Sequence, residues 1–81
     1  MRIPRDVGGD ELAKLLKQYG YEVTRQVGSH MRLTTKQAGE HHVTIPQHKP
    51  LRIGTLNSIL RDVAEHLQIS RDELAESLFE K

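Results

Sequence analysis

Three short segments of the chain, Tyr21–Val27, His30–Lys36 and Glu40–Ile45, alternate apolar and polar side chains and are separated by glycine-containing turns. Alternation with a period of two, in segments rich in β-branched residues, is typical of half-buried β-strands. The pattern predicts a three-stranded antiparallel meander with one apolar and one polar face. This meander constrains the fold more than any other feature of the sequence.

The turns decide which side chains share a face of the sheet. The loop between the second and third segments, Gln37–Gly39, fits a three-residue hairpin with its glycine in the left-handed conformation. This loop pairs Leu33 with Val43 and Met31 with Ile45. The apolar side chains then meet on one face, so the register of these two strands is well specified.

The turn between the first two segments allows two registers. A two-residue turn at positions 28 and 29 would pair Val27 with His30. Val23 would then lie opposite Thr34, which mixes the apolar and polar faces. We therefore predict a longer loop at this turn.

A three-residue loop over positions 27–29 pairs Gln26 with His30 and Val23 with Leu33, which keeps the core face apolar. The other face is expected to be open and polar. Its expected residues are Glu22, Thr24, Gln26, His30, Arg32, Thr34, His42 and Thr44.

Apolar residues at helical spacing flank the meander on both sides. The first predicted helix runs from Asp10 to Tyr19, with Gly20 just after its end. The second is expected to begin after Thr55 as its N-cap and to extend to about Gln68. Both helices carry one apolar face that can pack on the sheet.

The end of the chain predicts one more, shorter helix over residues 70–81. Ser70 is followed three residues later by Glu73, which is the pattern of a capping box. The complete order is helix, three strands, helix and a short C-terminal helix. This order predicts an α+β fold with the helices on one face of the sheet.

The chain of 81 residues is expected to form a single domain, 1–81. It has no cysteine, which excludes disulfides, thiolate nucleophiles and Cys-based zinc sites. The segment "MRIPRDVGG" has no apolar run, so no signal peptide is expected, and no segment approaches the roughly 20 apolar residues that span a membrane. A cytoplasmic protein is therefore expected. Residues 1–69 carry ten Lys/Arg against seven Asp/Glu, and residues 70–81 carry two against four. This mildly basic body is compatible with a polyanionic ligand but does not require one.

Two kinds of catalytic site are disfavoured by the residue pattern. His41 and His42 are adjacent on a strand and point to opposite faces, and no carboxylate completes a zinc-ligand spacing, so no metal or other cofactor is expected. Ser29 stands beside His30, but neighbouring residues rarely face each other and nothing marks a nucleophile elbow.

His30 is the best-placed candidate for chemistry. An imidazole is a natural general acid or base near neutral pH. RNA supplies its own nucleophile, the 2′-hydroxyl, so a ribonuclease needs little more than a proton carrier and a cation to meet the developing negative charge. Arg25 and Arg32 are nearby cations, and Gln26 and Thr24 are hydrogen-bonding neighbours. A histidine beside a turn is more often only exposed, so both interpretations stay open at this point.

Three motifs then occur in a characteristic order: "RQVGSH" at 25–30, "IPQH" at 45–48 and "GTLNSIL" at 54–60. Together with the helix "DELAKLLKQYGYEV" before them, they resemble the HicA (YcfA-like) family of bacterial toxins. The resemblance covers about residues 8–69. The segment 70–81 is an addition to the usual pattern. Its favoured role is to cover an apolar edge, and the alternative is a part in oligomerisation or antitoxin docking.

The resemblance implies a fold like a double-stranded-RNA-binding domain. It also implies an mRNA interferase, a metal-independent endoribonuclease that cleaves single-stranded mRNA and is blocked by a HicB-like antitoxin. The essential histidine of the family falls on His30. The expected RNA-binding residues are the motif positions Arg25, Gln26, Gly28 and Ser29, together with the neighbouring Arg32.

An alternative is a noncatalytic RNA-binding or partner-binding module on the same fold, with which the weak net charge and the added segment are compatible. The three aromatic residues, Tyr19, Tyr21 and Phe79, take core-like positions, so any RNA would be bound through backbone and shape contacts. Direct DNA binding is not expected outside a toxin–antitoxin complex, because no basic recognition helix is present.

Overall fold

The computed structural model describes residues 3–80, so Lys81 of the predicted C-terminal helix lies outside the described residues. Helices and strands follow the α+β order predicted from the sequence, which is consistent with a double-stranded-RNA-binding-domain-like fold. Their bounds are α1 Gly9–Leu15, the 3₁₀ turn η1 Leu16–Tyr19, β1 Glu22–Val27, β2 His30–Thr35, β3 His41–Pro46, α2 Ile53–Leu67 and α3 Arg71–Phe79.

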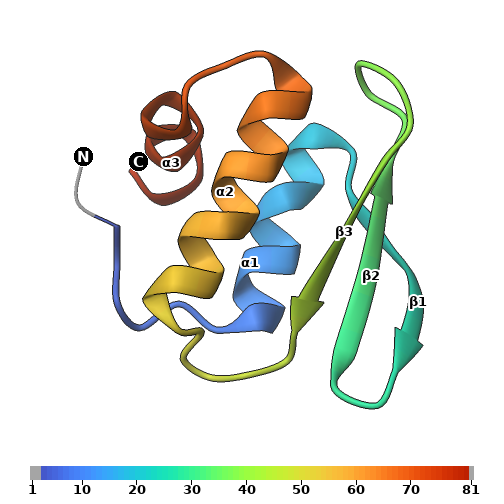
Figure 1. Cartoon of the computed structure of the whole chain (residues 1–81), viewed down its shortest axis with the longest axis vertical. Coiled ribbons are helices and arrows are strands. Elements are labelled where there is room, and N and C mark those ends of the chain that lie inside the picture. The colour runs from blue at the N-terminus through green and yellow to red at the C-terminus, as the bar shows by residue number, and fades with distance from the viewer. Residues whose placement is uncertain (1–2, 81) are drawn as a thin grey trace.

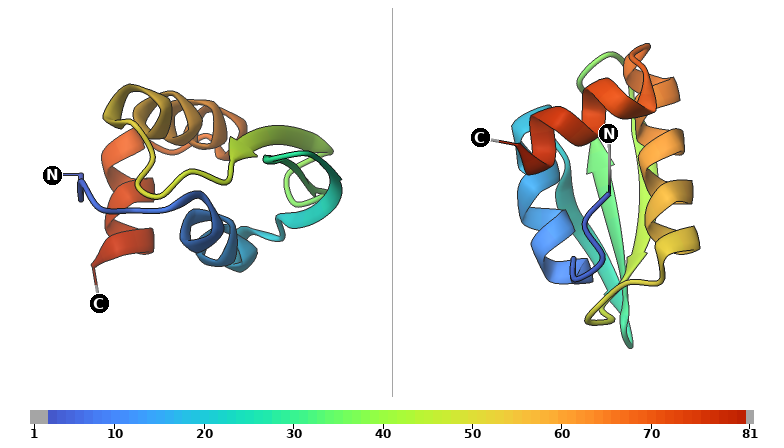
Figure 2. Two further views of the ribbon diagram at one scale, coloured as in Figure 1. Left: turned by 90° about the horizontal axis from the view of Figure 1, so that it is seen from below. Right: turned by 90° about the vertical axis from the view of Figure 1, so that its left-hand side faces the viewer.

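The three strands form one antiparallel sheet in the order β1-β2-β3, with β2 in the centre. Helices α1 and α2 lie side by side on one face of this sheet (Figure 1). Helix α3 packs on the side of α1 and α2 that is away from the sheet, so it forms a third layer (Figure 2). The other face of the sheet is uncovered, and we call it the open face.

The hydrophobic core fills the space between the sheet and the helices and continues beneath α3. The strands contribute Met31, Leu33, Val43 and Ile45, and the helices contribute mainly Leu12, Leu16, Leu56, Leu60, Val63, Leu74 and Leu78, all of them buried. The burial of Leu74 and Leu78 shows that α3 covers apolar surface of the other helices, the role expected for the added segment.

The predicted pairing of β2 with β3 is confirmed. Leu33 lies opposite Val43 and Met31 opposite Ile45, with all four side chains on the core side. The connecting loop turns through Ala38 and Gly39, whose φ angles are 59° and 101°. The apolar pattern alone specified this register, because a shift by one residue would expose the whole core face.

The predicted pairing of β1 with β2 is wrong at the turn. Val27 and His30 are direct partners, and Gln26 lies opposite Met31 instead of His30. The turn therefore has two residues, 28 and 29, and Gly28 supplies a φ of 58° that other residues rarely adopt. Gln26 is consequently on the helix side of the sheet.

A β-bulge reconciles this short turn with an apolar core face. The register shifts between Val23 and Arg25, so Val23 still pairs with Leu33 as predicted. The bulge places an extra residue, Thr24, in β1 and thereby restores the correct face beyond it. As a result, Arg25 and Val27 join Arg32 on the open face, and they replace Gln26 there.

The helix ends are confirmed in part. Helix α2 begins at Ile53, not after Thr55, because the amide of Leu56 already donates to the carbonyl of Arg52 and closes the first turn there (2.9 Å). Ser70 caps α3 as predicted: its Oγ accepts from the amide of Glu73 (3.0 Å), and its own amide donates to the Glu73 carboxylate (3.2 Å).

Candidate functional site

His30 is the first residue of β2 and sits directly after the two-residue turn. It lies between Val27 of β1 and Pro46 of β3, at the end of the sheet. Its side chain is exposed, and the imidazole makes no hydrogen bond to any residue between 3 and 80. Both ring nitrogens are therefore available to a ligand.

Hydrogen bonds of Gln47 fix the backbone next to His30. The carbonyl of Ser29 accepts a hydrogen bond from the amide of Gln47 at 2.6 Å. The side chain of Gln47 accepts from Gln26 Nε2 (2.7 Å) and donates to Asp10 Oδ1 (2.9 Å). The turn that carries His30 is thus linked through the segment after β3 to the first turn of α1.

Two arginines lie beside His30 on the open face. Arg25 and Arg32 are cross-strand partners, and neither guanidinium forms a hydrogen bond or ion pair within the described residues. Two like charges directly opposite each other destabilise a sheet unless an anion lies between them. With His30, Val27 and Thr44 they line a shallow hollow of about 210 Å³, which we call the arginine depression.

A second hollow borders His30 on its other side. It lies between the end of the sheet and the start of α2 and measures about 300 Å³. We call it the loop depression, and its lining residues are His30, Pro46, His48, Leu51, Arg52 and Thr55. His30 is the residue that the two depressions share.

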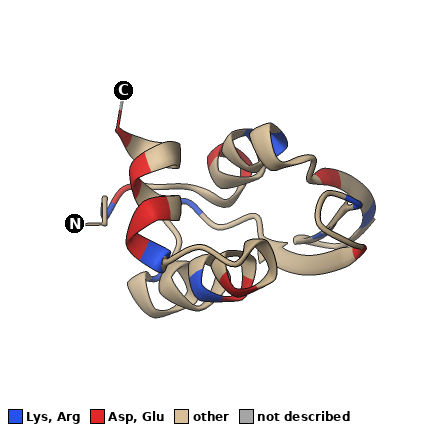
Figure 3. Cartoon of the chain, turned by 90° about the horizontal axis from the view of Figure 1, so that it is seen from above, with Lys and Arg blue, Asp and Glu red and all other residues tan. Residues whose placement is uncertain are grey.

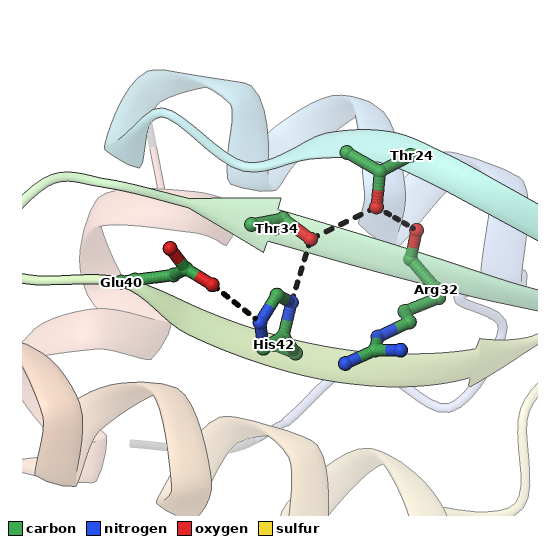
Figure 4. Close-up of polar contacts among 5 residues, drawn as sticks. All are labelled: Thr24, Arg32, Thr34, Glu40 and His42. Atoms are coloured by element: carbon green, nitrogen blue, oxygen red, sulfur yellow. Dashed lines mark hydrogen bonds and ion pairs between the residues drawn. The ribbon is translucent and has the colours of Figure 1, made fainter.

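The far part of the open face is occupied by a chain of polar side chains (Figure 4). The Thr24 hydroxyl donates to the carbonyl of Arg32 (3.3 Å), and Thr24 and Thr34 are joined through their hydroxyls (2.8 Å). Thr34 Oγ1 lies 2.7 Å from His42 Nδ1, and His42 Nε2 lies 3.0 Å from Glu40 Oε2. These contacts hold the bulged residue Thr24 against β2, and they engage the polar side chains of this half of the face with one another.

His41 and His66 form a cluster on the helix side of the sheet, separate from His30. Tyr21 Oη is 2.7 Å from His41 Nδ1, and His41 Nε2 is 3.1 Å from Asp62 Oδ1. His66 stacks on His41 and contacts the carbonyl of Gln37 (2.9 Å). Burial, and to a lesser extent the charge of Asp62, raises the pKa of Tyr21 to about 12. Between residues 3 and 80, no group of three His, Asp or Glu side chains is arranged to hold a metal ion.

The structure brings most of the predicted site residues together. Gly28 and Ser29 form the turn, and His30, Arg25 and Arg32 share the arginine depression. Gln26 is turned away to the helix side, where it supports Gln47. His48 was not singled out from the sequence, although extending the predicted register by one pair places Pro46, two residues before it, opposite His30.

Charge is distributed unevenly over the molecule. Asp and Glu positions occupy much of α3, on the side of the molecule away from the sheet, whereas the sheet carries positions of both signs (Figure 3). On the open face, Arg25 and Arg32 lie at the end near His30. Glu22 and Glu40 lie toward the other end, so the positive charge is local to the arginine depression. None of the helices within residues 3–80 is long and apolar enough to cross a membrane.

One comparison with known proteins identifies a family. A family model described as the HicA toxin of bacterial toxin–antitoxin systems matches residues 9–64, which include His30, both arginines and His48. No curated protein and no solved structure matches the chain. Helix α3 lies outside the matched residues.

Proposed function

The chain belongs to the HicA toxin family of bacterial toxin–antitoxin systems, and from this premise we propose that it is an endoribonuclease that cleaves single-stranded mRNA. One observation carries the proposal. The imidazole of His30 stands beside the guanidinium groups of Arg25 and Arg32 on an uncovered sheet face, and none of the three has a side-chain partner among residues 3–80.

This arrangement suits a reaction in which the RNA attacks itself. The 2′-hydroxyl adds to the adjacent phosphorus, and negative charge accumulates on the phosphoryl oxygens in the transition state. Guanidinium groups bind such oxygens with well-defined geometry and stay charged throughout. We assign Arg25 and Arg32 to the phosphate and His30 to a proton transfer, as general acid or base.

The proposed substrate and inhibitor follow from the same surface. The aromatic residues Tyr19, Tyr21 and Phe79 are all on the helix side, so RNA would contact the open face through its backbone and not through stacked bases. A HicB-like antitoxin is the expected inhibitor, and it would act by covering His30 and the arginines. Because mRNA is the target, the toxin would act in the cytoplasm.

The test compares three purified proteins on an mRNA fragment in EDTA: wild type, His30→Ala and His42→Ala. Loss of His30 is expected to lower the cleavage rate by ~10²–10⁴-fold, the usual contribution of a general acid or base. His42 is a matched control, because it is also an exposed histidine on the sheet but is already engaged by Thr34 and Glu40. Its variant should cleave as fast as wild type.

RNA binding by the same proteins completes the test. Arg32→Gln should weaken binding and reduce the dependence of log Kd on log salt by about 0.7, the value for one lost phosphate contact on a single strand. Equal cleavage by wild type and His30→Ala would refute the assigned chemistry. Salt-dependent binding without any cleavage by the wild type would instead support the noncatalytic RNA-binding module.

A further inference from the structure

Cleavage of RNA by its own 2′-hydroxyl needs two proton transfers. A base takes the proton from the 2′-oxygen as the new O–P bond forms, and an acid gives a proton to the 5′-oxygen as its bond to phosphorus breaks. The products are a 2′,3′-cyclic phosphate and a 5′-hydroxyl end. The attacking and leaving oxygens lie roughly in line on opposite sides of phosphorus, so one imidazole does not reach both in the same step.

We propose that His48 is the second proton-transfer residue, so that His30 and His48 divide these two steps between them. The proposal rests on the endoribonuclease function proposed above. His48 lines the loop depression together with His30. A phosphodiester centred on His30 has a nucleotide on each side, and the arginine and loop depressions lie on the two sides of His30.

Residue chemistry singles out His48 within the loop depression. The Arg52 guanidinium offers hydrogen-bond donors but no acceptor, and the Thr55 hydroxyl is a poor acid and base near neutrality. Besides His30, the other residues that line the hollow are Pro46 and Leu51, which carry no acid or base. Only an imidazole both accepts and releases a proton readily near pH 7. Among the residues that line this hollow, His48 is thus the one suited to work opposite His30.

The other histidines are already engaged. His41 contacts Tyr21 and Asp62, His42 contacts Thr34 and Glu40, and His66 contacts the carbonyl of Gln37. His30 and His48 are the two whose imidazoles have no hydrogen-bond partner within residues 3–80. These two unengaged imidazoles border the same hollow, although 18 positions separate them in the chain.

The backbone holds His48 at a set position relative to His30. The carbonyl of His48 accepts from the amide of Gly9 (2.9 Å), and the preceding amide, of Gln47, donates to Ser29 next to His30 (2.6 Å). Neither bond uses the imidazole of His48. Replacement of the side chain should therefore leave the loop and the fold intact.

The experiment uses the full chain and two RNA oligonucleotides that share one cleavage site. In the second oligonucleotide, sulfur replaces the bridging 5′-oxygen at that site, and a thiolate leaves without needing a proton. Wild type, His30→Ala, His48→Ala, His48→Asn and His42→Ala are compared on both. Circular dichroism confirms that each variant is folded, and His48→Asn keeps a hydrogen-bonding side chain that cannot transfer a proton at neutral pH.

On the ordinary RNA, both His48 variants are expected to lose ~10²-fold or more in rate. On the sulfur-containing RNA, one and only one of His30→Ala and His48→Ala should recover most of the wild-type rate, and the recovered variant identifies the acid. His42→Ala should match wild type on both substrates.

Two results overturn the proposal and are distinguishable from each other. If wild type cleaves and the His48 variants cleave equally fast, or if the sulfur substitution rescues both or neither of the two alanine variants, His48 does not share the proton transfers and the endoribonuclease function stands. If wild type itself cleaves neither oligonucleotide nor mRNA, the proposed function fails and this inference fails with it.

Discussion

The start of α1 gives the sharpest prediction about stability, because a methyl group added at Gly9 should push α1 and the segment after β3 apart. A Cβ added at Gly9 would lie 1.9 Å from the carbonyl oxygen of Pro46, 2.9 Å from its carbonyl carbon and 3.2 Å from the Cα of Gln47. All three are backbone atoms that cannot rotate away as a side chain would. Gly9→Ala must therefore push the segment after β3 away from α1.

The cost can be built up from the contacts that this movement disturbs. Carbon–oxygen separations below 3.0 Å do not occur at real Cβ atoms, so the segment must move by more than 1 Å. That shift breaks the bond from the Gly9 amide to His48 and strains the bond from Gln47 to Ser29. At ~1 kcal/mol for each bond, with loosened packing of the neighbouring core, we expect a loss of about 2–4 kcal/mol. A domain of this size has only about 4–12 kcal/mol in total.

Urea unfolding followed by circular dichroism measures this loss directly. The matched control is Gly54→Ala, the same chemical change in α2, where the new Cβ meets nothing within 4 Å. It should gain up to about 1 kcal/mol from helix propensity. A Gly9→Ala protein as stable as wild type, or a Gly54→Ala protein that loses as much as Gly9→Ala, would refute the steric argument.

Two further predictions concern Tyr21 and Ser70. The folded state favours the neutral phenol of Tyr21, so its contribution to stability is complete below pH 10 and is lost as the pH rises toward the folded pKa of about 12. In urea unfolding over this pH range, wild type should lose about 2–3 kcal/mol more than Tyr21→Phe. Parallel pH profiles of the two proteins would contradict the burial of the Tyr21 hydroxyl. Ser70→Ala removes the capping box of α3 and should cost about 1 kcal/mol, seen as a lower melting temperature. RNA cleavage per folded molecule should not change, because α3 lies outside both depressions; a fall in that rate would assign α3 a part in the site.

Local and strongly patterned features of the fold could be predicted from the sequence. The capping box of Ser70 depends on residues three positions apart, so no long-range contact was needed to find it. The pairing of Leu33 with Val43 followed from the apolar pattern, because any other register would expose the core.

The bulge could not be predicted in the same way. Nothing in the residues around Thr24 signals an extra position, since no glycine or proline is present there. The bulged residue is held by Thr34 and by the carbonyl of Arg32, which become neighbours only after the sheet has formed. The pattern argument also placed Val27 in the loop, whereas it pairs with His30 in β1 and is 62% exposed on the open face.

The site residues also differ in whether local sequence features could identify them. His30 could be identified because it follows a turn within a recognisable motif, and the two arginines because they are near it in the chain. His48 stands in a loop beyond Pro46, and only the folding of that loop against the turn brings it to the same hollow. Long-range placement of this kind leaves no local periodicity to detect.

The exposure of β1 has a consequence for how the molecule fluctuates. Every residue of this edge strand is exposed, and none belongs to the buried core, whereas β2 is anchored by Met31 and Leu33. Elements with few buried apolar contacts open at a much lower free energy than the global unfolding transition. The amides of β1 should therefore exchange with deuterium well before those of β2. Such local opening would displace Arg25 while Arg32 and His30, both on β2, stayed in place, so one of the two proposed phosphate contacts would be adaptable and the other fixed beside the imidazole.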